Sequence, residues 1–142
     1  MIIEPCVIEL SNHTNNINHH ERTLFEHLFG TYTLLQSLKK PRRVCLAGLY
    51  HSVYETEYFQ FDTPFTRPMV QELIGKEAES IVYEFCTTNP RTTNLVDRHG
   101  NWPDQMYADL LDVDIAQMRE QGYYNDVIKT MEAIRKHLQI KD

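Results

Sequence analysis

The spacing of apolar residues constrains the fold of this chain more than any other feature. From Thr23 onward, leucines and aromatic residues recur every three or four positions, the period of one helix face, and no stretch alternates as a strand would. Lys39 and Lys40 favour the end of the first such segment, and Pro41 stops it. The sequence therefore predicts an all-α bundle of about five to six helices. The predicted helices cover about 23–40, 44–54, 67–85, 92–99, 103–118 and 125–138.

The two ends of the chain differ in character. Residues 1–18 finish in the polar, aperiodic string SNHTNNIN, which predicts a weakly ordered N-terminal arm. Residues 19–142 are predicted to form a single helical domain, large enough for a hydrophobic core without a stabilising disulfide or metal. Cys45 and Cys86 lie in apolar helical patterns, so we expect buried free thiols.

Charge and hydropathy exclude two classes of partner. The net charge of −6 argues against a nucleic-acid-binding surface, which is normally basic. No apolar run approaches the roughly 18 residues that a membrane span needs, and the start MIIEPCVIEL lacks the basic region of a signal peptide. We therefore expect a cytoplasmic protein with a small-molecule partner. The aromatic-rich helices after Pro103 are expected to pack on the core, with a homodimer contact as the alternative.

Two of the histidines fall where metal ligands are expected. His27 lies near the apolar face of the first predicted helix, and His51 ends the apolar run VCLAGLYH. Neutral imidazole is a good ligand for Zn, Mn or Fe, although a buried histidine is also commonly a hydrogen-bonded core residue. His19 and His20 lie close enough to the first helix for one of them to reach the same site.

A divalent ion also needs a carboxylate, and three positions offer one. If the helix continues past His51, Glu55 lies one turn on over the same face and Glu57 lies on the far side. Asp97 follows an apolar pair in NLVDRHGN, so we expect it to be drawn inward. A salt bridge with a neighbouring arginine is the alternative for Asp97.

In order along the chain, His27, the pair His51–Ser52 and Asp97 resemble the H…HD…D pattern of the HD-domain metal-dependent phosphohydrolases. The likeness is greatest to the alarmone hydrolases, which remove pyrophosphate from guanosine tetra- and pentaphosphate. Their motif ALLHD-x-x-ED is similar to AGLYHSVYETE here, and their motif KLADR-x-x-N is similar to NLVDRHGN. The likeness covers about residues 20–105. The chain also resembles an HD-related group with an HS-x-YGTE-like motif.

This resemblance implies an HD-like helical bundle that holds a divalent metal. It places Ser52 where the family has a metal-binding aspartate, so another side chain would have to substitute. Arginines would neutralise the phosphate charge. The metal could be Mn, Fe, Zn or Mg, and whether it binds without the aspartate stays open. The predicted site comprises the metal ligands His27, His51 and Asp97, the catalytic residues Glu55 and Asn101, the substrate-binding residues Arg22 and Arg98, and the substitute ligands Ser52 and Glu57.

The sequence supports three hypotheses for function. The first is a metal-dependent phosphohydrolase acting on a nucleotide-like or other small phosphorylated substrate. The second is a catalytically inactive HD-like domain that binds a ligand or a partner protein, because Ser52 and Thr56 replace two acids of the motif. The third is an iron oxygenase of the HD superfamily, which would need further ligands such as His19, His20 or His99.

Overall fold

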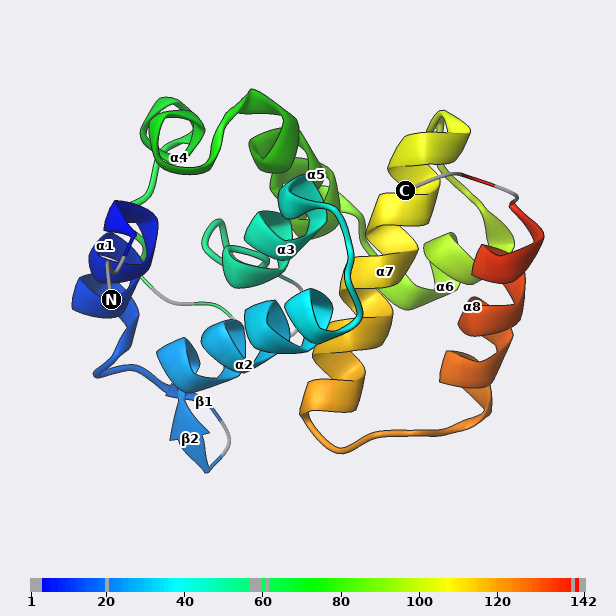
Figure 1. Cartoon of the computed structure of the whole chain (residues 1–142), viewed down its shortest axis with the longest axis horizontal. Helices are drawn as coiled ribbons and strands as arrows, with labels where there is room; N and C mark the ends of the chain where they lie inside the picture. The colour runs from blue at the N-terminus through cyan, green and yellow to red at the C-terminus, as the bar shows by residue number, and fades with distance from the viewer. Residues whose placement is uncertain (1–3, 20, 57–59, 61, 139, 141–142) are drawn as a thin grey trace.

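The computed structural model describes residues 4–19, 21–56, 60, 62–138 and 140, and these residues form eight α-helices and one short hairpin (Figure 1). In the hairpin, β1 (Asn18–His19) pairs antiparallel with β2 (Arg22–Thr23). None of the described helices is long and apolar enough to cross a lipid bilayer. The helices are α1 (Pro5–Thr14), α2 (Leu24–Ser37), α3 (Arg42–Leu49), α4 (Arg67–Ile74), α5 (Lys76–Thr87), α6 (Arg91–Asp97), α7 (Asp104–Glu120) and α8 (Asp126–His137).

Helix α3 occupies the centre of the molecule. It packs against α2, α5 and α7, and α7 in turn contacts α2 and α8 (Figure 1). Every residue of α3 from Val44 to Leu49 is buried, which confirms the prediction of a buried central helix in this part of the chain. The three cysteines are free thiols, and Cys45 is buried as predicted, whereas Cys86 is only half-buried.

The start of α2 is set by local hydrogen bonds. The Thr23 side chain accepts from the backbone N–H of Glu26, and the Glu26 carboxylate accepts from the backbone N–H of Thr23. This capping box satisfies N–H groups that the first turn leaves without helical partners. Because the helix begins here, His27 falls on the same buried face as Leu24 and Leu28.

A glycine brings α2 and α3 together at their crossing. A Cβ atom added to Gly48 would lie 2.3 Å from Cδ1 of Leu35, too close for an undisturbed contact. The absent side chain therefore lets α3 approach α2 closely. His51, three residues beyond Gly48, is thereby carried to the side of α2 on which His27 lies.

The count of five to six helices is wrong, and two local features explain the difference. Pro5 begins a helix that buries Cys6 and Leu10, within the range 1–18 where a weakly ordered arm was predicted. Gly75 has a φ of 90°, which breaks the predicted helix 67–85 into α4 and α5. The hairpin was not predicted either, because each of its strands has two residues, too few for an alternating pattern.

The turn between α6 and α7 is built around Trp102. Its ring stacks on Tyr107, with centroids 5.9 Å apart and an interplanar angle of 3°, and its Nε1–H donates to Glu84 at 3.1 Å. Arg98, with a φ of 52°, ends α6 in the left-handed conformation. The Trp102 contacts tie this turn to α7 through Tyr107 and to α5 through Glu84.

Candidate functional site

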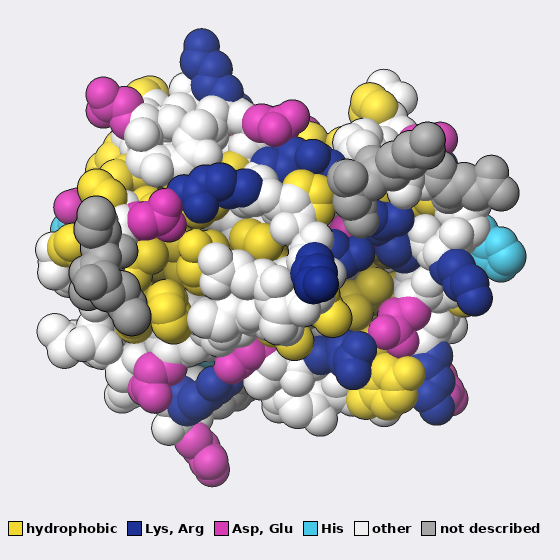
Figure 2. All heavy atoms as spheres, in the orientation of Figure 1, with side chains coloured by type: hydrophobic (Ala, Val, Ile, Leu, Met, Phe, Trp, Pro, Cys, Tyr) yellow, Lys and Arg dark blue, Asp and Glu magenta, His cyan; other side chains and the backbone are white. Residues whose placement is uncertain are grey.

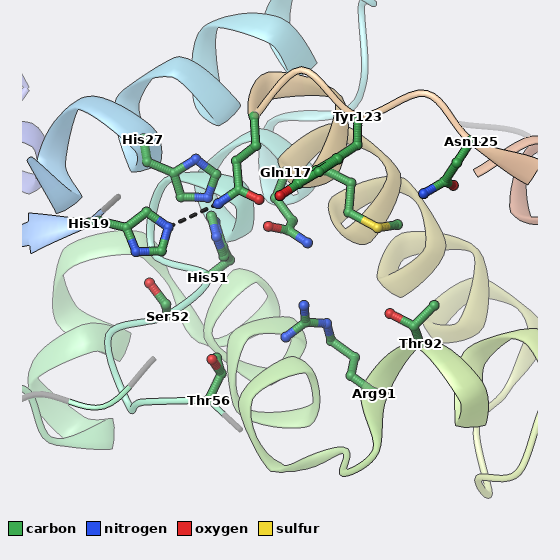
Figure 3. A pocket seen from close by; sticks show the side chains of 12 residues that line it. His19, His27, His51, Ser52, Thr56, Arg91, Thr92, Gln117, Tyr123 and Asn125 are labelled. Carbon is green, nitrogen blue, oxygen red and sulfur yellow. Dashed lines mark hydrogen bonds between the residues drawn. The ribbon is translucent and has the colours of Figure 1, made fainter. Parts of the chain in front are cut away.

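A cavity of about 420 Å³ is lined by side chains from β1, α2, the segment after α3, α6 and the end of α7 (Figure 3). We call it the histidine pocket, because three imidazoles contribute to its polar wall. No Asp or Glu is among the described residues that line it. The lining residues are His19, His27, His51, Ser52, Thr56, Arg91, Thr92, Gln117, Met118, Gln121, Tyr123 and Asn125.

His51 is buried and has one ring nitrogen in use. Its Nδ1 lies 2.7 Å from the carbonyl oxygen of Gly48, and since a carbonyl only accepts, Nδ1 carries the proton. Burial, and next the neighbouring His27, lower the pKa of His51 well below its usual value, so the ring is neutral near pH 7. A neutral ring with a proton on Nδ1 keeps a lone pair on Nε2, which is therefore the nitrogen free to bind a ligand.

His27 is oriented in the same manner by a carboxylate. Its Nδ1 lies 2.6 Å from Oε1 of Glu120, a residue at the end of α7, and donates its proton there. Burial lowers the pKa of His27, and this effect outweighs the opposing influence of Glu120. The His27 and His51 rings meet edge to face with centroids 5.0 Å apart. The pocket therefore contains two adjacent neutral imidazoles whose Nδ1 atoms are both occupied.

Glu120 is held by more than His27. Arg22 makes two hydrogen bonds to its carboxylate, at 2.6 and 2.5 Å. The Arg22 and His27 hydrogen bonds lower the pKa of Glu120 despite its burial, so it is ionised near pH 7. A Cβ atom at Gly30 would lie 2.3 Å from Oε2 of Glu120, so a glycine is needed for this approach. Arg22 was predicted to bind the phosphate of a substrate, but it does not line the pocket. It instead holds Glu120, the carboxylate that orients His27.

His19 is the third imidazole of the pocket. Its ring stacks on that of His27, with centroids 4.8 Å apart. Its Nε2 accepts a hydrogen bond from the amide nitrogen of Gln121 at 2.9 Å, drawn as the dashed line in Figure 3. Of the further ligands that an iron site would need, His19 is therefore near, His99 is exposed, and His20 lies outside the described residues.

Arg91 supplies the positive charge of the pocket. Its guanidinium lies over the Phe85 ring at 4.3 Å, and its Nε donates to Asp114 at 3.1 Å. Both Arg91 and Asp114 are buried, so the guanidinium is paired with a carboxylate away from solvent. Figure 3 shows the Arg91 side chain reaching into the pocket from α6, across from His51 and Gln117.

Ser52, the residue in place of the expected aspartate, lines the pocket beside His51. Its Oγ is buried and has no hydrogen-bond partner among the described residues. A buried hydroxyl in this condition costs free energy, because it has lost its water without a replacement. The same position that lacks a carboxylate thus contains a polar atom available to a bound group.

The expected catalytic residue Glu55 does not join the pocket. Helix α3 ends at Leu49, before His51, so the helical spacing that would place Glu55 over His51 does not exist. Glu55 instead has a φ of 71° in the turn that follows, and it is not a lining residue. Thr56 takes a place in the lining. Glu57 lies outside the described residues.

Asp97, Arg98 and Asn101 are all exposed and lie outside the pocket lining. The reason is the helical period of α6. Arg91 and Leu95 are four residues apart and share the inward face, whereas Asp97 falls on another side of the helix. Arg98 pairs with Asp104 at 2.5 Å. The predicted grouping of Asp97 with His27 and His51 is therefore not present.

Three residues in or behind the pocket were not predicted from the sequence. Arg91 and Gln117 face the histidines from α6 and α7, and Glu120 lies 93 positions beyond its partner His27. The predicted fifth helix stopped at Met118, two residues before Glu120. A longer helix prediction would have placed Glu120 on α7, but no local pattern connects it to α2.

The donor set decides which metal the pocket could accommodate. Among the described residues, no group of three or more His, Cys, Asp or Glu side chains could hold a metal ion. Two neutral imidazoles next to the partnerless Ser52 hydroxyl fit an ion that takes nitrogen ligands, such as Zn²⁺ or Fe²⁺. They do not fit Mg²⁺, which is bound through oxygen ligands. The Nδ1 hydrogen bonds of His27 and His51 are those that orient metal-binding histidines.

Fold and site together define a helical protein with a buried polar pocket centred on paired histidines. The chain belongs to the family described as Domain of unknown function (DUF6817), whose model matches residues 10–90, more than half of the chain. No curated protein and no solved structure matches it. The matched range includes His27 and His51 but ends just before Arg91. No HD-domain family model matches the chain, so the resemblance to HD enzymes stays a prediction.

Proposed function

We propose that this protein is a metal-dependent phosphohydrolase related to the HD enzymes, acting on a small phosphorylated molecule in the histidine pocket. One observation carries the proposal. His27 and His51 lie side by side in the pocket wall, each with Nδ1 bound to an acceptor, and His27 also has a hydrogen-bonding contact with the Gln117 side chain. This arrangement is the one that histidine ligands adopt, because the second hydrogen bond fixes both the tautomer and the ring orientation.

In the proposed site, the imidazoles of His27 and His51 would hold Zn²⁺ or Fe²⁺, with Ser52 beside them. Such an ion, when bound, lowers the pKa of a water and polarises a phosphoryl oxygen. Arg91 neutralises the phosphate charge from the opposite wall, and its ion pair with Asp114 fixes its direction. Glu120 keeps His27 in the tautomer that leaves Nε2 unprotonated.

A second function is favoured by a different observation. The described lining residues include no carboxylate, so none of them offers a hard, charged metal ligand. The pocket would then bind a phosphorylated ligand through Arg91, Thr56 and Thr92 without turning it over. This is the inactive domain of the second hypothesis, and it shares the pocket and the ligand class with the first.

Metal binding is tested first and separately from turnover. The purified protein, stripped with a chelator, is titrated with Zn²⁺ and Fe²⁺ in a calorimeter, and the bound ion is counted by elemental analysis. We expect about one ion per chain, and His27→Ala or His51→Ala to weaken binding by about tenfold or more. His137→Ala, an exposed histidine at the end of α8, is the matched control and should leave binding unchanged.

Turnover is then measured as phosphate or pyrophosphate released from a panel of nucleoside mono-, di- and tetraphosphates by the metal-loaded protein. We expect release to fall at least tenfold in Arg91→Lys, which keeps the charge but loses the fork geometry of the guanidinium. Nucleotide binding by calorimetry without any release would establish the second function. Absence of both metal binding and nucleotide binding would overturn both.

A further inference from the structure

A second cavity, of about 430 Å³, lies where α2, α7 and α8 meet, and none of its lining residues belongs to the histidine pocket. We call it the α8 cavity. In the face shown in Figure 2, hydrophobic side chains lie among Lys and Arg side chains on the side of the molecule formed by α7 and α8. The residues that line the cavity are Leu35, Leu38, Lys40, Asp112, Ile115, Ala116, Arg119, Glu132, Arg135, Lys136 and Ile140.

The wall of the α8 cavity contains a buried carboxylate that is only half satisfied. Asp112 is 4% exposed, and its Oδ1 accepts from Arg135 at 2.9 Å and lies 3.3 Å from Lys40 Nζ. Its Oδ2 is buried and has no hydrogen-bond partner among the described residues. Burial raises the pKa of Asp112 even though two cations oppose the shift. A carboxylate oxygen in this condition favours a hydrogen-bond donor beside it.

The charges around Asp112 favour an anion in the rest of the cavity. Four cationic side chains and two carboxylates line it, and Lys40 and Arg135 share the Asp112 carboxylate. Arg119 pairs with Glu132 at 3.3 Å. Lys136 makes no ion pair with any other described residue, so its ammonium is available to a bound acid.

The remaining wall is aliphatic. Leu35, Ile115 and Ala116 are buried core residues whose side chains also form the inner surface, and Leu38 at the rim is 48% exposed. Covering the exposed Leu38 with hydrocarbon is favourable, because it removes apolar surface from water. The cavity thus combines a hydrogen-bond acceptor, the Lys136 ammonium and an apolar surface.

We propose that the α8 cavity binds a small organic anion that has an aliphatic part and a hydroxyl group. The hydroxyl donates to Asp112 Oδ2, which a modest rotation about the soft χ2 torsion brings to the cavity surface. The acid group meets Lys136, and the aliphatic part covers Leu35 and Leu38. This site is independent of the histidine pocket and of the function proposed for it.

Three matched probes separate the parts of the proposal: 3-hydroxyoctanoate, octanoate, which lacks the hydroxyl, and 1,3-octanediol, which lacks the charge. Each is titrated into the isotope-labelled full chain, and backbone amide shifts are followed by NMR. We expect 3-hydroxyoctanoate to bind about tenfold more tightly than octanoate, the effect of one hydrogen bond to a charged group, and the diol to bind most weakly. The amides of Lys40, Ile115 and Arg135 should shift, and those of His51 and Arg91 should not.

Two variants test the named contacts. Lys136→Gln should weaken both acids about tenfold while leaving the diol unaffected, and Lys129→Gln, an exposed lysine on α8 outside the cavity, is its matched control. Asp112→Leu should reduce the preference for 3-hydroxyoctanoate over octanoate, provided that the amide spectrum stays folded. Equal binding of the three probes, shifts confined to the histidine pocket, or no binding at millimolar concentration would each overturn the proposal.

Discussion

Glu120 accepts hydrogen bonds from two side chains, and its removal would leave both donors without this acceptor. His27 Nδ1–H and the Arg22 guanidinium both donate to its carboxylate, which lies 11% exposed at the end of α7. The His27 side chain is 2% exposed, so water cannot replace the lost acceptor there. Arg22 is 38% exposed and would recover part of its loss from solvent.

Glu120→Gln tests this arrangement at the residue scale. The amide keeps an acceptor for His27 but loses the charge that Arg22 pairs with, so we expect the free energy of unfolding in urea to fall by about 1–2 kcal/mol. Glu132→Gln is the control, since its ion pair with Arg119 is more exposed and should cost about 0.5 kcal/mol or less. Equal losses in the two variants would show that Glu120 is an ordinary surface carboxylate.

The same residues show what the sequence could predict of the site. His27 and His51 were found because each breaks an apolar pattern within its own segment, a local feature that one chain displays. Arg91 and Glu120 could not be found this way, because their roles depend on how α6 packs on α7 and how α7 packs on α2. The predicted inward orientation of Asp97 was wrong. It was inferred from the apolar residues next to it, but Asp97 itself lies on another side of the helix.

Among the elements, the contact between α2 and α3 depends on a missing side chain. Gly48 lies against Leu35, and its carbonyl oxygen also accepts from His51. A glycine inside a helix normally costs about 0.5–1 kcal/mol relative to alanine. Replacing Gly48 with alanine would raise the helix propensity, but the added methyl group would collide with Leu35 in the packed core.

Gly48→Ala therefore should destabilise the protein despite the better helix former. Overpacking of a core costs about 1–3 kcal/mol, so we expect a lower midpoint of urea unfolding, and a reduced metal affinity if α3 and His51 shift together. Gln36→Ala, on the exposed face of α2, is the comparison and should change the midpoint little. A midpoint for Gly48→Ala that equals or exceeds the native value would contradict the close approach.

Helices were predicted more reliably than their ends. The long periodic segments of α2, α7 and α8 were recognised from spacing alone, since burial of one face dictates that spacing. The end of α3 was not, because VCLAGLYH continues apolar into the turn that follows Leu49. Both the helix and the turn after it contain apolar residues, so composition does not show where the helix ends. The inferred position of Glu55 depended on that end and was therefore wrong as well.

For the molecule as a whole, the buried histidines set a limit on acid stability. His27 and His51 have pKa values below the usual value, chiefly because of burial, whereas in the unfolded chain a histidine titrates near about 6.5. Between these values the unfolded chain binds more protons than the folded one. The free energy of unfolding therefore falls as the pH is lowered from about 6.5, and is insensitive to these two groups above it.

Urea unfolding of the metal-free protein at a series of pH values checks this. We expect an unchanged midpoint above about pH 7 and a progressive fall below about pH 6.5, with at most about 1.4 kcal/mol per pH unit from each histidine. His51→Gln should flatten that fall, and His137→Gln, which changes an exposed residue, should not. An identical slope in native protein and His51→Gln would mean that His51 is not held neutral by the fold.

The position of Trp102 determines what can be seen by fluorescence. It is the single tryptophan of the chain, stacked on Tyr107 and bonded to Glu84, and it lines neither cavity. Its emission therefore responds to separation of this turn from α5 and α7 and hardly at all to ligand uptake. Tryptophan emission would therefore stay constant in a titration with a ligand that binds, although it would change on denaturation. Constant emission in such a titration is not evidence that the ligand does not bind.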